Sequence, residues 1–149
     1  MHKLGLTLGA LALCCVSQSA RAQEHYTNGP IRRVLHVAIT PGHGPEFWQD
    51  LRQNVKPLYD AYKAQGLIED WFTFIKSTKE DRDDWDVGLA LQFKNWAAFD
   101  TFAARVDSVV IRHYGTKESR DQAAQRRSQH GTLVSSFLVR YVTLKEWGK

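Results

Sequence analysis

Apolar residues repeat along this chain with a period of two in some segments and of about 3.6 in others, and the order of these segments constrains the fold most. The patterns predict strands at residues 32–40, 68–77, 87–93 and 135–144, and helices at residues 46–65, between Asn95 and Gly115, and at residues 117–129. The order is β-α-β-β-α-β, with an extra helix before the last strand. It predicts an α+β, ferredoxin-like antiparallel sheet with both long helices on one face.

Residues that typically begin, interrupt or end helices support these boundaries. Pro45 suits the first position of a helix, and Pro57 is expected to kink the same helix. Gly66 suits its C-terminal cap, and Asn95 can cap the next helix. The 117–129 helix has little apolar surface, so we expect it to lie on the surface.

The first 22 residues have the order of a secretory signal peptide. Lys3 supplies the positive start, residues 4–16 are apolar apart from Thr7, and Ala20-Arg21-Ala22 is a small-x-small cleavage site. The apolar run is too short to span a bilayer comfortably. We therefore expect cleavage after Ala22 and export to the periplasm or the extracellular space. A retained anchor and a lipoprotein are the alternatives.

Cleavage would leave 127 of the 149 residues and remove both cysteines, Cys14 and Cys15. The mature chain would then have no disulfide, thiol nucleophile or cysteine metal ligand. It would carry 18 basic and 16 acidic residues, with no nucleic-acid motif. We expect a loose segment at residues 23–31, one domain at residues 32–145, a tail at residues 146–149, and no membrane contact after cleavage.

With this element order, the aromatic hairpin formed by the second and third strands and the closing strand "SSFLVRYVTL", the chain resembles the dimeric α/β-barrel superfamily over about residues 32–145. The resemblance implies a homodimer in which two sheets pack face to face. It also implies a pocket between the sheet and the helices of each subunit. Members include cofactor-free monooxygenases, haem-degrading enzymes and small isomerases, so the resemblance implies a fold and a dimer more firmly than a reaction.

Strand residues alternate between the two faces of a sheet, which sorts the strands by parity. The purely apolar sets are expected to meet the helices: Leu35, Val37 and Ile39; Val87, Leu89, Leu91 and Phe93; Phe137, Val139 and Tyr141. The opposite face then brings together His36, Gln92 and Arg140. In the second strand we place Phe72 and Phe74 with the helices, and Trp71 and Thr73 with the polar set.

His36 and Arg140 are the candidate catalytic residues. A neutral imidazole can act as a base or anchor a ligand, and a guanidinium can hold a carboxylate or an oxyanion. Trp71, Thr73, Gln92 and His43 are the candidate ligand-binding residues. The alternative is that the polar strand residues only bond one another or the partner subunit, as buried polar groups normally do.

The spacing of His, Asp and Glu predicts no metal site, and we expect no cofactor. Some haem-binding relatives place an axial histidine on a helix, which implies His113 if haem binds; a histidine near a helix C-terminus is also simply stabilising. The leading hypothesis is an exported homodimer that binds a small apolar or aromatic molecule, with monooxygenase- or isomerase-like activity. A non-catalytic binding or assembly module is the alternative.

Overall fold

The computed structural model describes residues 25–79, 81 and 84–147 of the chain. These residues fall into two compact units. The larger unit is Pro30–Val139, and the smaller one contains residues 25–29 and 140–147 of the described chain. The predicted signal peptide, residues 1–22, lies outside the described residues.

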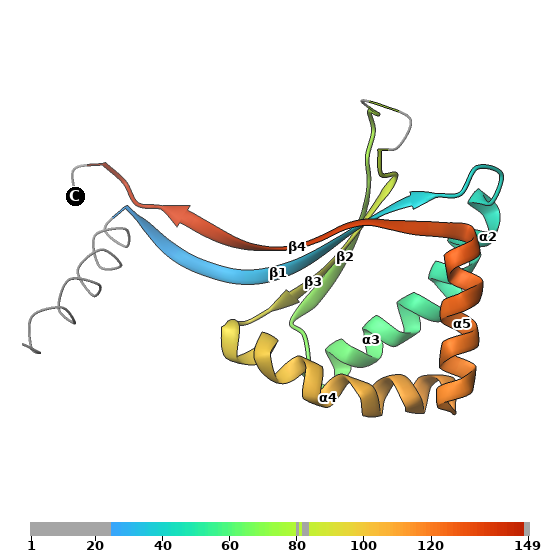
Figure 1. Ribbon diagram of the computed structural model, residues 1–149. Helices are drawn as coiled ribbons and strands as arrows, with labels where there is room; N and C mark the ends of the chain where they lie inside the picture. The colour runs from blue at the N-terminus through green and yellow to red at the C-terminus, as the bar shows by residue number, and fades with distance from the viewer. Residues whose placement is uncertain (1–24, 80, 82–83, 148–149) are drawn as a thin grey trace, which may run out of the picture. The chain divides into compact units, whose positions relative to one another are not determined.

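The element order confirms the predicted fold class (Figure 1). In chain order the elements are β1 (Tyr26–Ile39), α2 (Gly44–Asp50), η1 (Leu51–Val55), α3 (Lys56–Ala64), β2 (Asp70–Ile75), β3 (Val87–Phe93), α4 (Trp96–Tyr114), α5 (Lys117–His130) and β4 (Gly131–Leu144). The strands form one sheet in the order β2-β3-β1-β4. β3 pairs antiparallel with both β1 and β2. This is the ferredoxin-like order, with α5 as the extra helix before the last strand.

Two strands begin earlier than the sequence predicted. β1 begins at Tyr26 rather than Arg32, so residues 26–31 are extended strand and not the loose segment that we expected. β4 begins at Gly131, four residues ahead of the predicted start. Both extensions contain polar or small residues with weak alternation, and pairing with a neighbouring strand holds them extended.

The predicted kink at Pro57 takes the form of a π-helical turn. α2 and α3 are joined by the five-residue turn η1, and the Lys56 N–H bonds the Leu51 carbonyl five residues back. Pro57 has no N–H to offer a carbonyl four residues back, so the regular helical ladder cannot pass through it. The segment remains helical throughout but is divided at this turn.

Helix caps match the predicted residues. Asn95 accepts a hydrogen bond from the Ala98 N–H at 2.9 Å and begins α4. At the end of α3, Gly66 has a φ of +65°, and the next residue, Leu67, donates its N–H to the Tyr62 carbonyl at 2.9 Å. This pair of features is a Schellman motif, which ends the helix because glycine adopts the left-handed conformation without steric cost.

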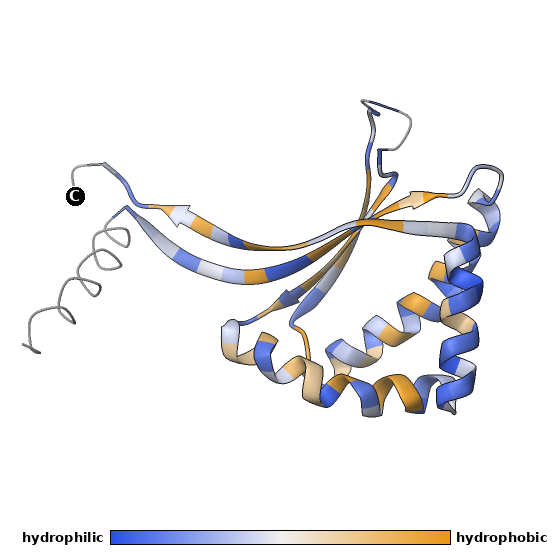
Figure 2. Cartoon of the chain, viewed as in Figure 1, coloured by the Kyte–Doolittle hydropathy of each residue, from blue (hydrophilic) through white to orange (hydrophobic). Residues whose placement is uncertain are grey.

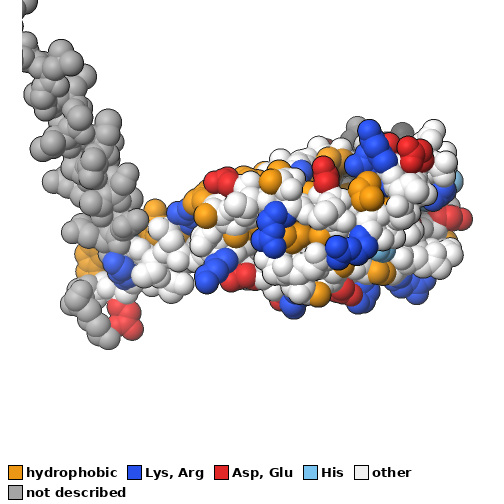
Figure 3. Space-filling view, turned by 90° about the horizontal axis from the view of Figure 1, so that it is seen from below, with side chains coloured by type: hydrophobic (Ala, Val, Ile, Leu, Met, Phe, Trp, Pro, Cys, Tyr) orange, Lys and Arg blue, Asp and Glu red, His pale blue; other side chains and the backbone are white. Residues whose placement is uncertain are grey.

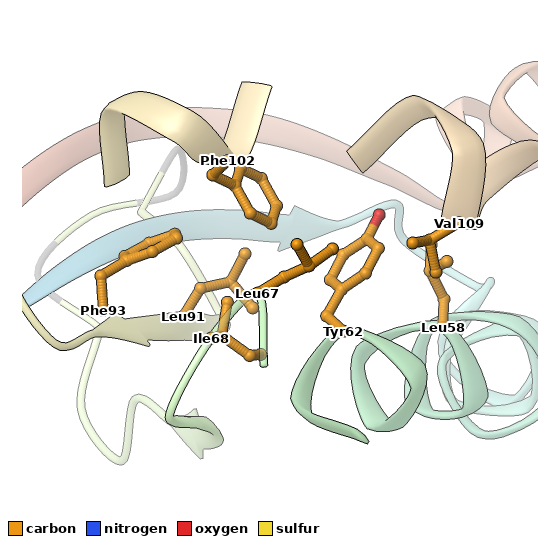
Figure 4. Close-up of a cluster of buried hydrophobic side chains, with 8 residues drawn as sticks. All are labelled: Leu58, Tyr62, Leu67, Ile68, Leu91, Phe93, Phe102 and Val109. Carbon is orange, nitrogen blue, oxygen red and sulfur yellow. The ribbon is translucent and has the colours of Figure 1, made fainter. Parts of the chain in front are cut away.

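The core of the larger unit has two parts. Figure 4 shows the first, where α3 and α4 meet β3 and the segment before β2 through Leu58, Tyr62, Leu67, Ile68, Leu91, Phe93, Phe102 and Val109. The second joins the buried residues Phe47, Leu51 and Val55 to Val87 and Leu89, with Leu35, Val37 and Ile39 packed against them. These contacts confirm the predicted helix-facing sides of β1 and β3.

α5 differs from the other helices in polarity. It is mostly hydrophilic along its length (Figure 2). Ala123 is its only buried residue. The prediction of a polar surface helix is therefore confirmed. Around the helices, acidic and basic side chains are interspersed on the face that Figure 3 shows rather than gathered by sign.

The face assignment of β2 was wrong. The indole of Trp71 donates Nε1–H to Asp60 on α3 at 3.0 Å and lies edge-on to Tyr59, so it faces the helices. Phe72 and Phe74 lie on the opposite face. Every residue of this strand from Trp71 to Ile75 except Thr73 is apolar, so its pattern carried no information on which face is buried.

The assignment of Phe137 to the helix-facing side of β4 was also wrong. Its ring lies edge-on to His36, with centroids 5.1 Å apart, whereas Leu133 lines a pocket on the helix side. Residues 133 and 137 share one face of a regular strand, so the alternation shifts by one residue between them, as at a β-bulge. The prediction that Arg140 shares the face of His36 rested on the unshifted pattern.

Candidate functional site

A pocket of about 470 Å³ lies between the sheet and the helices of the larger unit. Strands β1, β3 and β4 line it from the sheet, and α2, η1, α3 and α5 line it from the helices. Its lining residues are Leu35, Val37, Phe47, Asp50, Leu51, Val55, Tyr59, Leu89, Ala124, Arg127, Ser128, Gly131 and Leu133. Most are apolar, with a small number of polar groups, which is the usual composition of a small-molecule site.

The main polar group of this pocket is the pair Asp50–Arg127. Arg127 Nε donates to Asp50 Oδ2 at 2.7 Å, and Arg127 Nη2 donates to the Tyr114 hydroxyl at 3.0 Å. Two partners therefore hold the guanidinium in one orientation at the pocket wall. A planar guanidinium held in this way presents its remaining N–H groups in a defined direction to an anionic or carbonyl oxygen.

Tyr59 is a second polar group of the lining. Burial raises the pKa of its phenol, and the nearby Arg127 opposes this only in part. The hydroxyl is therefore neutral at physiological pH and can donate one hydrogen bond. Its ring packs against Tyr62 and Trp71, with centroids 5.7 Å from each.

None of the polar residues of this pocket was among the predicted site residues. Asp50 and Arg127 are separated by 77 positions, and each lies in a segment where charged residues are ordinary for a helix surface. The resemblance implied a pocket between sheet and helices, but no local pattern indicated which polar side chains would line it.

His36 lies on the other face of the sheet, within an aromatic cluster. Its ring stacks on Trp85 with centroids 3.9 Å apart and planes 8° apart, and Phe74 and Phe137 lie edge-on to it. Its Nδ1 lies 3.2 Å from the Ser135 hydroxyl. We use the name open face for the side of the sheet that carries these residues together with Arg32, Ala38, Phe72 and Val134.

The surroundings of His36 favour the neutral imidazole. Burial lowers its pKa below the ordinary value, the positive charge of Lys76 lowers it further, and Asp84 opposes both. Lys76 and Asp84 form an ion pair with each other beside the stack. The ring can therefore accept or donate hydrogen bonds as a neutral group near pH 7.

Gln92 shares the open face with His36 but is bound elsewhere. Its Oε1 accepts from Arg32 Nε at 2.8 Å, and its Nε2 donates to Glu69 at 3.2 Å. Gln92 is four residues along β3 from Gly88, the residue that pairs with His36, which corresponds to roughly 13 Å. Gln92 and His36 are thus placed on one face but are not brought together.

The other predicted site residues are dispersed. Arg140 belongs to the smaller unit, where its Nη1 donates to Asn28 at 3.0 Å. Thr73 pairs in register with Leu89 and is exposed. His113, at the end of α4, lies edge-on to Tyr114 with centroids 4.7 Å apart.

His43 meets a histidine that the sequence did not point to. Its Nδ1 lies 3.4 Å from Nδ1 of His130, the last residue of α5, and the ring centroids are 5.3 Å apart. The two residues are 87 positions apart, so only the fold brings them together. Within the described part of the chain, no three His, Cys, Asp or Glu side chains cluster as metal ligands would.

None of the helices in the described residues combines the length and the apolar character that crossing a membrane requires. No protein-family model and no curated protein matches the chain.

Three solved structures with low sequence identity are similar to this chain. One is a dimeric protein of unknown function and ferredoxin-like fold from Bacteroides fragilis, with 14% identity over 78% of this chain and 98% of that chain and a TM-score of 0.43. A hypothetical protein from Arabidopsis thaliana has 13% identity over 82% and 94%, with a TM-score of 0.45. A dimeric ferredoxin-like protein of unknown function from Thermobifida fusca has 8% identity over 80% and 95%, with a TM-score of 0.38. The fold of this chain follows from its own strand order.

Proposed function

We propose that this protein binds a small, mostly apolar molecule that carries one anionic or carbonyl group, and that it does so in the pocket between sheet and helices. The observation that carries the proposal is the guanidinium of Arg127, held by Asp50 and Tyr114 at the wall of an otherwise apolar pocket of about 470 Å³. A pocket of that volume falls within the usual range for ligands of drug-like size.

The chemistry of the walls defines the ligand. Leu35, Val37, Leu51 and Leu89 offer no hydrogen bonds, so most of the ligand surface must be apolar. An oxygen of the ligand near Arg127 would receive charge-assisted hydrogen bonds, which are stronger than neutral ones. Asp50 already neutralises much of the positive charge of Arg127. The pocket therefore favours a ligand with a carbonyl or a singly charged group over one with a phosphate.

The test is to fill the pocket without disturbing the core. Ala124 lines the pocket from α5 but is exposed, so Ala124→Phe can add a ring to the site at little cost to folding. Ala104→Phe, at an exposed position of α4 outside the pocket, is the matched control. Anilinonaphthalene sulfonate, an aromatic anion that fluoresces in apolar surroundings, is the probe.

The expected result is that the dye binds the wild type and the Ala104→Phe variant alike and that Ala124→Phe loses most of the fluorescence. Arg127→Met is expected to weaken binding of the dye more than binding of an uncharged naphthalene analogue, because only the sulfonate can bond the guanidinium. Equal dye binding by the wild type and Ala124→Phe would place the dye elsewhere and overturn the proposal.

Catalysis at His36 and Arg140 stays a prediction. The stack on Trp85 covers one face of the imidazole, and Phe74 and Phe137 lie at its edges. These contacts support a role for His36 in the packing of the open face. A panel of candidate ligands and substrates, compared between wild type, His36→Ala and Arg140→Ala, distinguishes a reactive site from a structural one.

We also propose that a second copy of this chain covers the open face. Four of its apolar side chains are substantially exposed: Phe72 (36%), Phe74 (39%), Val134 (46%) and Phe137 (40%). An apolar patch of this kind is uncommon on a soluble monomer. Arg32 bonds Gln92 and Lys76 pairs with Asp84, so two identical faces can meet without repulsion between unpaired like charges.

Sedimentation at micromolar concentration tests this interface. The wild type and the Ala104→Glu control on α4 are expected to sediment as dimers, and Val134→Glu and Phe137→Glu as folded monomers. Ala90 is less suitable for substitution, because it is buried within the single chain, with only 3% of its surface exposed. A charge there would disrupt the fold of the chain itself. A monomeric wild type would contradict the proposal.

Export is the third part of the proposed function. It is supported by the charge, apolar run and small-x-small site of residues 1–22. Expression of the full chain in a bacterium with a periplasm is expected to yield a periplasmic product that begins at Gln23, as measured by mass spectrometry. Cytoplasmic, uncleaved protein would contradict this part and leave the pocket proposal intact.

A further inference from the structure

The side chains of His43 and His130 form a pair that neither the pocket nor the open face uses. His43 immediately precedes α2 and His130 ends α5, and their Nδ1 atoms lie 3.4 Å apart. Neither residue lines the pocket, although Gly131 and Phe47 nearby do. Both histidines are partly exposed, so a solute can reach them.

The backbone holds this pair in place. The Thr40 N–H donates to the His130 carbonyl at 3.0 Å, and the His43 N–H donates to the Thr40 carbonyl at 3.0 Å. The backbone of Thr40 is thus hydrogen-bonded to the backbone of both histidines. The Phe47 ring packs close against Gly131, which limits relative movement of α2 and the end of α5.

The separation of the two nitrogen atoms suits a shared metal ion. Metal–imidazole bonds of about 2.0–2.1 Å in tetrahedral geometry place two ligand nitrogens roughly 3.3–3.4 Å apart. The 3.4 Å separation is longer than the usual range of about 2.7–3.2 Å for a hydrogen bond from an N–H group. Ligation requires both Nδ1 atoms to be unprotonated, with their two lone pairs directed at one ion between the rings.

We propose that His43 and His130 together bind a divalent transition-metal ion. Imidazole pairs select Zn²⁺, Cu²⁺ or Ni²⁺ over Mg²⁺ and Ca²⁺, which prefer oxygen ligands. Since no third His, Cys, Asp or Glu joins the pair among the described residues, water or a solute completes the coordination. The bound ion would link the start of α2 to the end of α5.

Calorimetric titration with ZnCl₂ at pH 7.5 tests the site. The protein used is the mature chain, which begins at Gln23 and carries no tag. The wild type is expected to bind one ion per chain. His43→Ala and His130→Ala are each expected to lower the affinity at least about tenfold, because each removes one of two protein ligands. His113→Ala and His25→Ala are the matched controls and are expected to bind as the wild type does.

Two further measurements separate a metal site from a structural pair. His43→Gln keeps a polar side chain in the turn, so a folded variant that still loses zinc affinity supports ligation. MgCl₂ is expected to produce no heat of binding, because Mg²⁺ prefers oxygen ligands. Absence of zinc binding in the wild type, or unchanged affinity in both alanine variants, would overturn the proposal whatever the pocket binds.

Discussion

The imidazole of His36 and the indole of Trp85 are stacked almost in parallel, with ring centroids 3.9 Å apart and planes 8° apart. His36 belongs to β1, and Trp85 lies just before β3. The stack shields His36 from water on one side and places it near the Lys76 ammonium, which lies 5.5 Å from the indole centroid. The chemistry of this histidine therefore depends on a residue 49 positions away in sequence.

His36 is expected to titrate below the ordinary histidine value of about 6.5. Burial and, after it, Lys76 lower its pKa. Trp85→Leu uncovers the ring and is expected to move this pKa back toward the ordinary value. A pH titration of the His36 ring protons by NMR in wild type and variant measures both. An unchanged pKa in Trp85→Leu would show that the stack does not shield the ring.

The same shift predicts a pH dependence of stability. The folded-state pKa of His36 lies below its unfolded value, so the unfolded chain binds more protons between the two values. The contribution to stability is therefore present above about pH 6.5 and is lost as the pH falls through the folded-state value. Urea unfolding from pH 5 to pH 8 is expected to show this loss, and His36→Phe to flatten that part of the profile.

Gly88→Ala is expected to destabilise the protein by about 1–2 kcal/mol. A Cβ atom at Gly88 would overlap the ring of Phe74, which must then leave its contacts with His36 and Trp85. Gly44→Ala, with no atom within 4 Å of the added Cβ, is the matched control. In a Phe74→Ala background, Gly88→Ala is expected to cost much less; an equal cost would locate the strain in the backbone.

Removal of either partner of the Asp50–Arg127 pair is expected to lower the free energy of unfolding by about 1–2 kcal/mol, because the other charge stays partly buried without its bond. Asp50→Asn and Arg127→Met are compared with the double variant by urea unfolding. The two losses are expected to be non-additive. Simple additivity would mean that the pair contributes nothing as a pair.

Gly66→Ala is expected to cost about 1 kcal/mol, because an L side chain at a φ of +65° is strained. The Cβ itself meets open space, so the effect isolates the backbone conformation. Thermal or urea unfolding measures it, again with Gly44→Ala as the control. A neutral Gly66→Ala would indicate that the Schellman motif at the end of α3 can relax.

Much of the fold was predictable because its determinants are local. The cap at Asn95, the end of α3 at Gly66 and the interruption at Pro57 each depend on hydrogen bonds within a few residues. The buried faces of β1 and β3 follow from strict alternation of large apolar residues with smaller or polar ones. The ferredoxin-like order then follows from the order of the elements.

The tertiary structure decided the features that depend on residues far apart. In β2 the apolar residues occur on both faces, so only pairing with β3 determined that Trp71 faces the helices and Phe74 faces His36. In β4 the shift between Leu133 and Phe137 is invisible to any alternation pattern. The pairs Asp50–Arg127 and His43–His130 arise from the packing of α5 against α2, and a pattern of nearby residues cannot specify such a contact because its energy depends on both partners at once.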